Sequence, residues 1–179
     1  MTNERVQTPA QTVGPFFGYA LPYEGGEDLL DRSHPSAIRL HGTVFDGDGV
    51  GIPDALVEIW QPDEHGDISH EPGSLRRDGY TFTGFGRSAT DPTGHYQFTT
   101  VGPGSTGGTP FIAVIVFARG MMHKLHTRIY LPETPADALP SGLDPQRAQT
   151  LVAARETDGS LRHDIHLQGE RETVFFAYD

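Results

Sequence analysis

Cysteine is absent from this sequence of 179 residues, basic residues are scarce, and no long apolar run occurs. Without cysteine the chain forms no disulfide and offers no thiolate nucleophile, zinc ribbon or iron–sulfur ligand. The longest apolar run, Phe111 to Ala118, has the length of a buried strand and falls short of the about 18 residues that a membrane span needs. Thirteen Lys and Arg against 24 Asp and Glu give a formal net charge of −11, which disfavours nucleic-acid binding.

The first residues also lack the charged and then apolar pattern of an export signal, so we expect a cytoplasmic protein that binds neither membranes nor nucleic acids. What the sequence does contain is 22 glycines and 14 prolines, which favour frequent turns. Ten Phe and six Tyr supply apolar volume for a core, and the length favours a single domain.

Residues 1–36 show no sustained hydrophobic period, whereas short alternating segments begin at residue 37. We predict that 1–36 form an N-terminal arm lying across another surface, anchored by Phe16 and Phe17 behind the stiff Gly14–Pro15 corner. The alternative is a frayed terminus. Residues 37–179 are expected to form the rest of a single domain.

Turn residues separate the short segments, a pattern that predicts a mainly β fold, an antiparallel β-sandwich with long loops. One short helix is expected to begin at Asp144–Pro145, because an N-cap is followed by proline at the first position and Ala148, Leu151 and Val152 recur at helical spacing. The run 111–118, apolar on both faces, is expected to be a central strand. The expected strands cover residues 39–46, 55–60, 95–101, 111–118, 125–131, 161–167 and 172–178.

The residues by themselves yield no complete catalytic set. The pairs His123/His126 and His163/His166 are spaced so that the two members would point to opposite faces of a strand, which makes them poor joint metal ligands. No Gly-x-Ser-x-Gly elbow occurs, and the glycine loop 102–108 lacks the lysine and helix of a phosphate loop. The remaining histidines are expected beside turns or at exposed positions: His41, His65, His70 and His95.

Two arginines are the candidates for binding an anion. Arg119 follows the most apolar segment, where a charge is costly without a partner, and Arg128 lies within an alternating strand. Each forms either a structural ion pair or a guanidinium fork for a ligand carboxylate. Arg119 is the stronger candidate, since it is expected where a buried strand leaves the sheet.

Seven stretches of the chain together carry a resemblance to a known family: Gln11–Phe17, Leu40–Asp46, Gly51–Gln61, Gly86–Phe98, Val116–Gly120, His126–Tyr130 and Gln168–Phe176. They resemble the intradiol ring-cleaving dioxygenases, and the resemblance covers essentially the whole chain. Within that family, the resemblance is most specific to the iron-free alpha-type subunits of the members that act on protocatechuate.

The resemblance implies a non-haem ferric iron held by two tyrosines and two histidines, a ligand set suited to Fe(III). It matches those four positions to Ile68, Thr106, Phe111 and Ala113, with the Pro103–Gly104 loop offering only serine, threonine and glycine. None of these side chains binds iron. We therefore expect no metal in this chain and Fe(III) in a partner beta subunit instead.

The resemblance further implies that this chain completes a site in a homologous beta subunit, in αβ units of a larger oligomer. There protocatechuate would react with O2 to give 3-carboxy-cis,cis-muconate, a step of aromatic catabolism in the beta-ketoadipate pathway. Thr12, Gly14 and Pro15 match a wall of that site, and Arg119 matches an arginine near the substrate carboxylate. The alternatives are a self-sufficient dioxygenase for catechol or hydroxyquinol, and a non-enzymatic transthyretin-like binding module.

Overall fold

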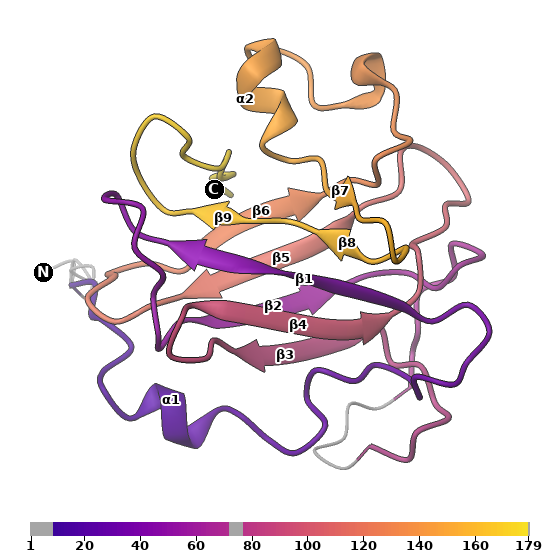
Figure 1. Ribbon diagram of the computed structural model, residues 1–179, viewed down its shortest axis with the longest axis horizontal. Coiled ribbons are helices and arrows are strands. Elements are labelled where there is room, and N and C mark those ends of the chain that lie inside the picture. Colours follow the sequence, from indigo (N-terminus) through magenta and orange to yellow (C-terminus); the bar gives the residue numbers. More distant parts are fainter. Residues whose placement is uncertain (1–8, 72–76, 179) are drawn as a thin grey trace, which may run out of the picture.

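Two sheets pack face to face in the computed structural model, which describes residues 9–71 and 77–178 (Figure 1). One sheet runs in the order β4-β1-β8-β7, with β9 also paired to β1, and the other runs β3-β2-β5-β6. The predicted β-sandwich is thus confirmed. No helix in the described part of the chain is long and apolar enough to cross a membrane.

The five-stranded sheet is mixed because two of its C-terminal strands pair parallel to β1. β1 and β4 are antiparallel, whereas β8 and β9 run parallel to β1. Its strands are β1 (Ile38–Phe45), β4 (His95–Thr100), β7 (Ala154–Arg155), β8 (Leu161–Arg162) and β9 (Ile165–His166).

The four-stranded sheet is antiparallel throughout and holds the candidate site at one end. Its strands are β2 (Leu56–Trp60), β3 (Phe85–Ala89), β5 (Ile112–Phe117) and β6 (Leu125–Ile129). As expected, β5 is a central strand, since it lies between β2 and β6, and only its alternate residues are buried. Its inward residues pack in the core between the sheets, together with Leu40, Val44, Val57, Ile59, Tyr96 and Phe98.

The N-terminal region is divided between the sandwich and the surface. Leu29 and Leu30 belong to the main core, and the Arg87 backbone N–H donates to the Gly26 carbonyl at 2.7 Å along the outer strand β3. Further towards the N-terminus, the one-turn helix α1 (Phe17–Ala20) buries Phe17, while Phe16 is 76% exposed. The described part of the predicted arm therefore presents Phe16 rather than Phe17 to its surroundings.

The predicted helix forms but is short. α2 (Pro145–Gln149) begins at Asp144, whose side chain accepts a hydrogen bond from the Gln146 N–H. It ends early because Leu151 and Ala153 bond to the backbone of Tyr130 instead. A 3-10 turn (Ala136–Ala138) precedes it, and the two pack near a second core cluster of Tyr130, Leu139, Ala148, Leu151 and Val174.

The strand predicted at 172–178 is wrong, because the backbone donors there go to different partners. Thr173 donates to the His166 carbonyl and Val174 to the Thr150 hydroxyl. Phe176 makes the one β-bridge within residues 172–178, donating to the His126 carbonyl at 2.8 Å beside β6.

Candidate functional site

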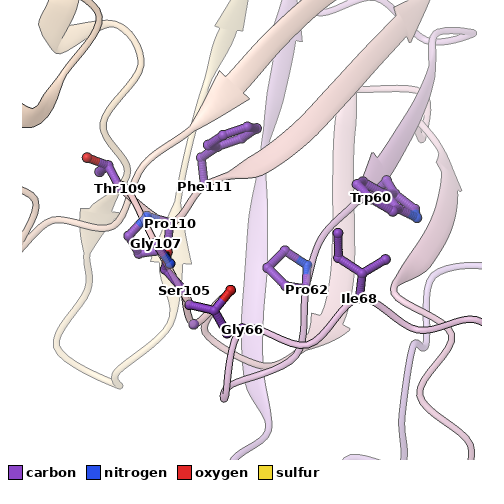
Figure 2. Close-up of a pocket in the computed structure, with 11 residues that line it drawn as sticks. Trp60, Pro62, Gly66, Ile68, Ser105, Gly107, Thr109, Pro110 and Phe111 are labelled. Carbon is purple, nitrogen blue, oxygen red and sulfur yellow. The ribbon is translucent and has the colours of Figure 1, made fainter.

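A pocket of about 230 Å³ opens at the end of the four-stranded sheet where β2 ends and β5 begins (Figure 2). Two loops, 62–68 and 104–110, complete it. Figure 2 shows Trp60 and Ile68 on one side, Phe111 and Pro110 on the other, and Pro62 between them.

Glycines allow these two loops to touch backbone to backbone. The Gly104 N–H donates to the Asp63 carbonyl at 2.7 Å, and a Cβ added at Gly104 would clash with the Glu64 carbonyl. Gly66 has φ +91°, and a Cβ there would lie 2.6 Å from the Ser105 backbone.

The Asp63 carboxylate stabilises the turn in which it lies. Burial works against the charge of that carboxylate, but bonds from the Asp67 and His65 N–H groups hold its pKa below its usual value.

Three of the four positions matched to iron ligands lie in this pocket, namely Ile68, Thr106 and Phe111. Ala113 is on β5 in register with Trp60, next to the pocket. The lining contains no imidazole, carboxylate or phenol, so its donor set does not fit Fe(III). Nor does any group of three or more His, Cys, Asp or Glu in residues 9–71 and 77–178 form a metal site.

Two of the hydroxyl side chains that line the pocket are already bonded within the chain. The Ser105 hydroxyl donates to the Gly108 carbonyl at 2.9 Å, and the Thr109 hydroxyl donates to the Ala138 carbonyl at 3.1 Å. Trp60 and Ile68, in contrast, are 45% and 46% exposed. The pocket thus presents apolar surface and no free charge.

Arg119 lies at the opposite end of the same strand pair. The β2–β5 register pairs Leu56 with Phe117, and its continuation by two residues sets Asp54 opposite Arg119. The two side chains form an ion pair, and the Arg119 side chain is 66% exposed. Asp54 was not among the sequence-predicted residues, because its place opposite Arg119 depends on the β2–β5 register.

Thr12, Gly14 and Pro15 lie in the N-terminal segment before α1. Thr12 and Pro15 are exposed, and Gly14 adopts φ +78°, which favours glycine there. Along the long axis of the molecule, this segment lies at the same end as the loop after β5 that carries Arg119 (Figure 1). The structure therefore separates the sequence-predicted residues into two groups, one at each end of β5.

Arg128 does not join either group. Its guanidinium is stacked between the rings of Phe111 and Phe176, at 4.2 and 4.9 Å from their centroids. Burial works against its charge, but the hydroxyls of Tyr130 and Tyr178 raise its pKa. The ion-pair alternative is not what holds Arg128, since no carboxylate among the described residues pairs with it.

One histidine differs from the predicted exposed or turn positions, and a second histidine is also buried. His41 lies within β1 and is 9% exposed, with Nε2 3.1 Å from the Glu156 carboxylate and Nδ1 3.4 Å from His95. His163 is 3% exposed, and burial lowers its pKa to about 4. Both imidazoles lie on the five-stranded sheet side of the sandwich, away from the pocket, and serve its packing.

Comparison with known proteins gives a consistent set of similarities. A family model described as Dioxygenase matches residues 13–111. The chain is 37% identical over 202 residues to the protocatechuate 3,4-dioxygenase alpha chain of Pseudomonas putida, covering 96% of each chain. It is 31% identical over 142 residues to the protocatechuate 3,4-dioxygenase beta chain of Burkholderia cepacia, covering 74% of this chain and 57% of that one.

Among solved structures, the chain is similar to the dioxygenase domain of a dioxygenase and carbohydrate-binding protein fusion from Streptomyces sp. SirexAA-E. The TM-score is 0.58 at 25% identity, with 90% of this chain and 96% of that chain covered. The similarity thus extends over nearly the whole sandwich.

Proposed function

The chain belongs to the intradiol ring-cleaving dioxygenase family, and on that premise we propose that it is the iron-free, alpha-type subunit of a heteromeric dioxygenase that cleaves protocatechuate. In this proposal a homologous beta-type chain holds the Fe(III), and the present chain forms part of the wall around the substrate. The product is 3-carboxy-cis,cis-muconate, formed when the bond between the two hydroxyl-bearing carbons is cleaved and both atoms of O2 are incorporated.

The observation that carries the proposal is the composition of the pocket at the end of β2 and β5. A family member that works alone needs iron ligands, yet apolar and small side chains occupy this position here. The similarity to an alpha chain over 96% of both lengths supports the same reading, because it extends to the N-terminal segment and to the loop after β5.

Arg119 gives this chain a chemical role, although residues 9–71 and 77–178 hold no metal site. Its guanidinium is mostly exposed, with Asp54 on one side, so a substrate carboxylate has access to the remaining N–H donors. Thr12, Gly14 and Pro15, at the same end of the molecule, would exclude water and limit the orientations of the bound ring. In this proposal the chain binds and orients the substrate, while the metal held by the partner supplies the reaction with O2.

The test is to produce this chain alone, the beta-type chain alone, and both together. Iron content is measured by metal analysis, and oxygen uptake is followed with protocatechuate. We expect iron and activity in the co-produced complex, and neither in this chain alone. Iron bound to the isolated chain together with cleavage of catechol or hydroxyquinol would favour the self-sufficient dioxygenase. A complex whose activity equals that of the beta-type chain alone would favour a non-enzymatic binding module.

A further inference from the structure

The segment that follows the N-terminal arm is held against the outer strand β3 by Arg87. The Nη1 group of Arg87 donates to the Leu21 carbonyl at 2.7 Å, and the guanidinium lies 5.7 Å from the centre of the Tyr23 ring. The backbone N–H of Arg87 donates to the Gly26 carbonyl, also at 2.7 Å. Arg87 therefore contacts residues 21–26 at three points.

A second arginine, Arg77, contacts the same tyrosine. Its Nη2 group donates to the Tyr23 hydroxyl at 3.0 Å and to the Phe85 carbonyl at 2.6 Å, and its guanidinium also lies 5.7 Å from the ring centre. Phe85 is the first residue of β3, so both arginines connect Tyr23 to this strand. The ring and the hydroxyl of Tyr23 are thus both engaged.

The guanidinium of Arg87 also bonds to the strand pair that presents Arg119. Its Nε and Nη2 groups donate to the Glu58 carboxylate at 2.8 and 2.6 Å, and both side chains are mostly buried. Glu58 lies in β2, whose register with β5 continues to Asp54 opposite Arg119. Because a guanidinium carries five N–H donors in one plane, Arg87 can bond to residues 21–26 and to β2 at the same time.

One turn of helix separates Leu21 from the arm. The Leu21 N–H donates to the Phe17 carbonyl at 3.1 Å, and the Ala20 N–H donates to the Phe16 carbonyl at 3.0 Å. The Phe17 side chain is 5% exposed, and Pro15 lies two residues before it. A displacement of Leu21 is therefore passed through α1 to Pro15.

We propose that Arg87 is a positioning residue for the substrate, because it holds Thr12, Gly14 and Pro15 of the arm in a fixed place relative to Arg119. This inference rests on the proposed function, in which the arm and Arg119 both contact protocatechuate. Arg87 itself does not touch the substrate. Since the substrate binds to molecules whose arm is in place, release of the arm raises KM by the factor by which that population falls.

Cleavage of the isolated chain by chymotrypsin tests the hold on the arm without partner or iron. Phe16 and Tyr19 are 76% and 87% exposed, and cleavage after them follows the population in which the surrounding backbone opens. The double variant Glu58→Leu/Arg87→Met removes the bond to Leu21 and leaves no buried charge unpaired. A bond from a guanidinium to a carbonyl changes an equilibrium about tenfold, so cleavage at both sites should be about tenfold faster. Equal rates in the wild type and the double variant would overturn the proposal.

Oxygen uptake by the assembled enzyme tests the effect on the substrate. In the double variant, KM for protocatechuate should be about tenfold above that of the wild type and kcat should be unchanged, because release of the arm weakens binding and leaves the reaction step intact. A purely structural ion pair predicts instead that KM equals the wild-type value once the apolar replacements restore stability. That result in an active complex would overturn the positioning role.

A second variant leaves the ion pair of Arg87 in place. Tyr23→Ser removes the ring from both guanidiniums, and it too should speed cleavage and raise KM. Wild-type values of both quantities in this variant would overturn the proposal. Arg147→Met is the control, since it removes an exposed ion pair with Glu172 on another part of the surface, and it should change neither quantity.

The two measurements separate this inference from the proposed function on which it rests. A wild-type complex without activity on protocatechuate would contradict the proposed function, and the cleavage rates would then still decide whether Arg87 holds the arm. Faster cleavage together with an unchanged KM in an active complex would overturn the effect of Arg87 on the substrate.

Discussion

Replacing Arg119 by alanine in the assembled enzyme should weaken the binding of a carboxylated catechol and leave that of an uncharged catechol unchanged. Arg119 follows β5 and faces Asp54 across the extension of the β2–β5 register, so one side of its guanidinium is engaged and the other is free. Removing the side chain removes the guanidinium that we propose binds a substrate carboxylate, without touching the core.

The expected size of the effect follows from the exposure of the side chain. A hydrogen bond between charged groups contributes about 1.5–3 kcal/mol. Because Arg119 is 66% exposed and shares its charge with Asp54, the lower value applies. A loss of about 1.5 kcal/mol corresponds to a roughly tenfold increase in KM for protocatechuate. Asp54→Asn should act in the opposite direction and lower KM about threefold, because it removes a competing carboxylate whose exposed ion pair is worth under about 1 kcal/mol.

Oxygen uptake with protocatechuate and with catechol provides the assay, and kcat is recorded for both. Arg155→Ala is the matched control, since Arg155 forms an exposed ion pair with Glu133 on another part of the surface. Equal changes in KM for the two substrates would refute a carboxylate-binding role for Arg119. An increase in KM for Asp54→Asn would show instead that Asp54 positions the guanidinium.

Three further predictions concern stability, each measured by urea unfolding of the chain. Arg87→Met should lower the free energy of unfolding by about 3 kcal/mol, because it leaves the 14% exposed Glu58 without its ion-pair partner at 2.6 Å. The double variant Glu58→Leu/Arg87→Met should regain most of the lost stability, and no recovery would contradict the ion-pair explanation. His163 alone should lower stability by about 2 kcal/mol from pH 7.5 to 5.0, because its pKa is about 4 when folded and 6.5 when unfolded, so the unfolded chain binds more protons in that range. His163→Phe should lose this contribution and retain that of His95, His126 and His166, whose pKa values burial also lowers. A pH profile that is unchanged in His163→Phe would exclude His163 as a source. Gly42→Ala should prevent native folding, since its Cβ would overlap the His163 carbonyl, and a soluble variant with wild-type stability would disprove that close approach.

The sandwich was predictable wherever a strand shows its own alternation of apolar and polar residues. β2, β4, β5 and β6 fall within expected segments, and β1 begins one residue before its expected segment. β3 was not predicted, because its two buried positions are Gly86 and Ser88, small residues that give no hydrophobic signal. Its pairing with β2 creates the strand, and that pairing is a tertiary contact.

The candidate site was predictable only as far as residue identity goes. The sequence indicates which ligand positions changed, but not that Ile68, Thr106 and Phe111 share one pocket with Trp60, since loop contacts between Gly66 and Gly104 bring them together. Neither the Asp54 partner of Arg119 nor the burial of His41 could be read from local pattern. Both depend on cross-strand register, where a shift of one residue would change every neighbour.

The two outer strands of the four-stranded sheet are each met by a segment from near one end of the chain. Gly26 accepts from Arg87 on β3, and Phe176 donates to His126 on β6. An unpaired outer strand is a template for pairing between molecules, and these contacts remove part of that hazard. A chain cut before Phe176 would expose β6 and should associate with itself as its concentration rises. Purification tags and fusions that pull the last residues away from β6 carry the same risk of aggregation.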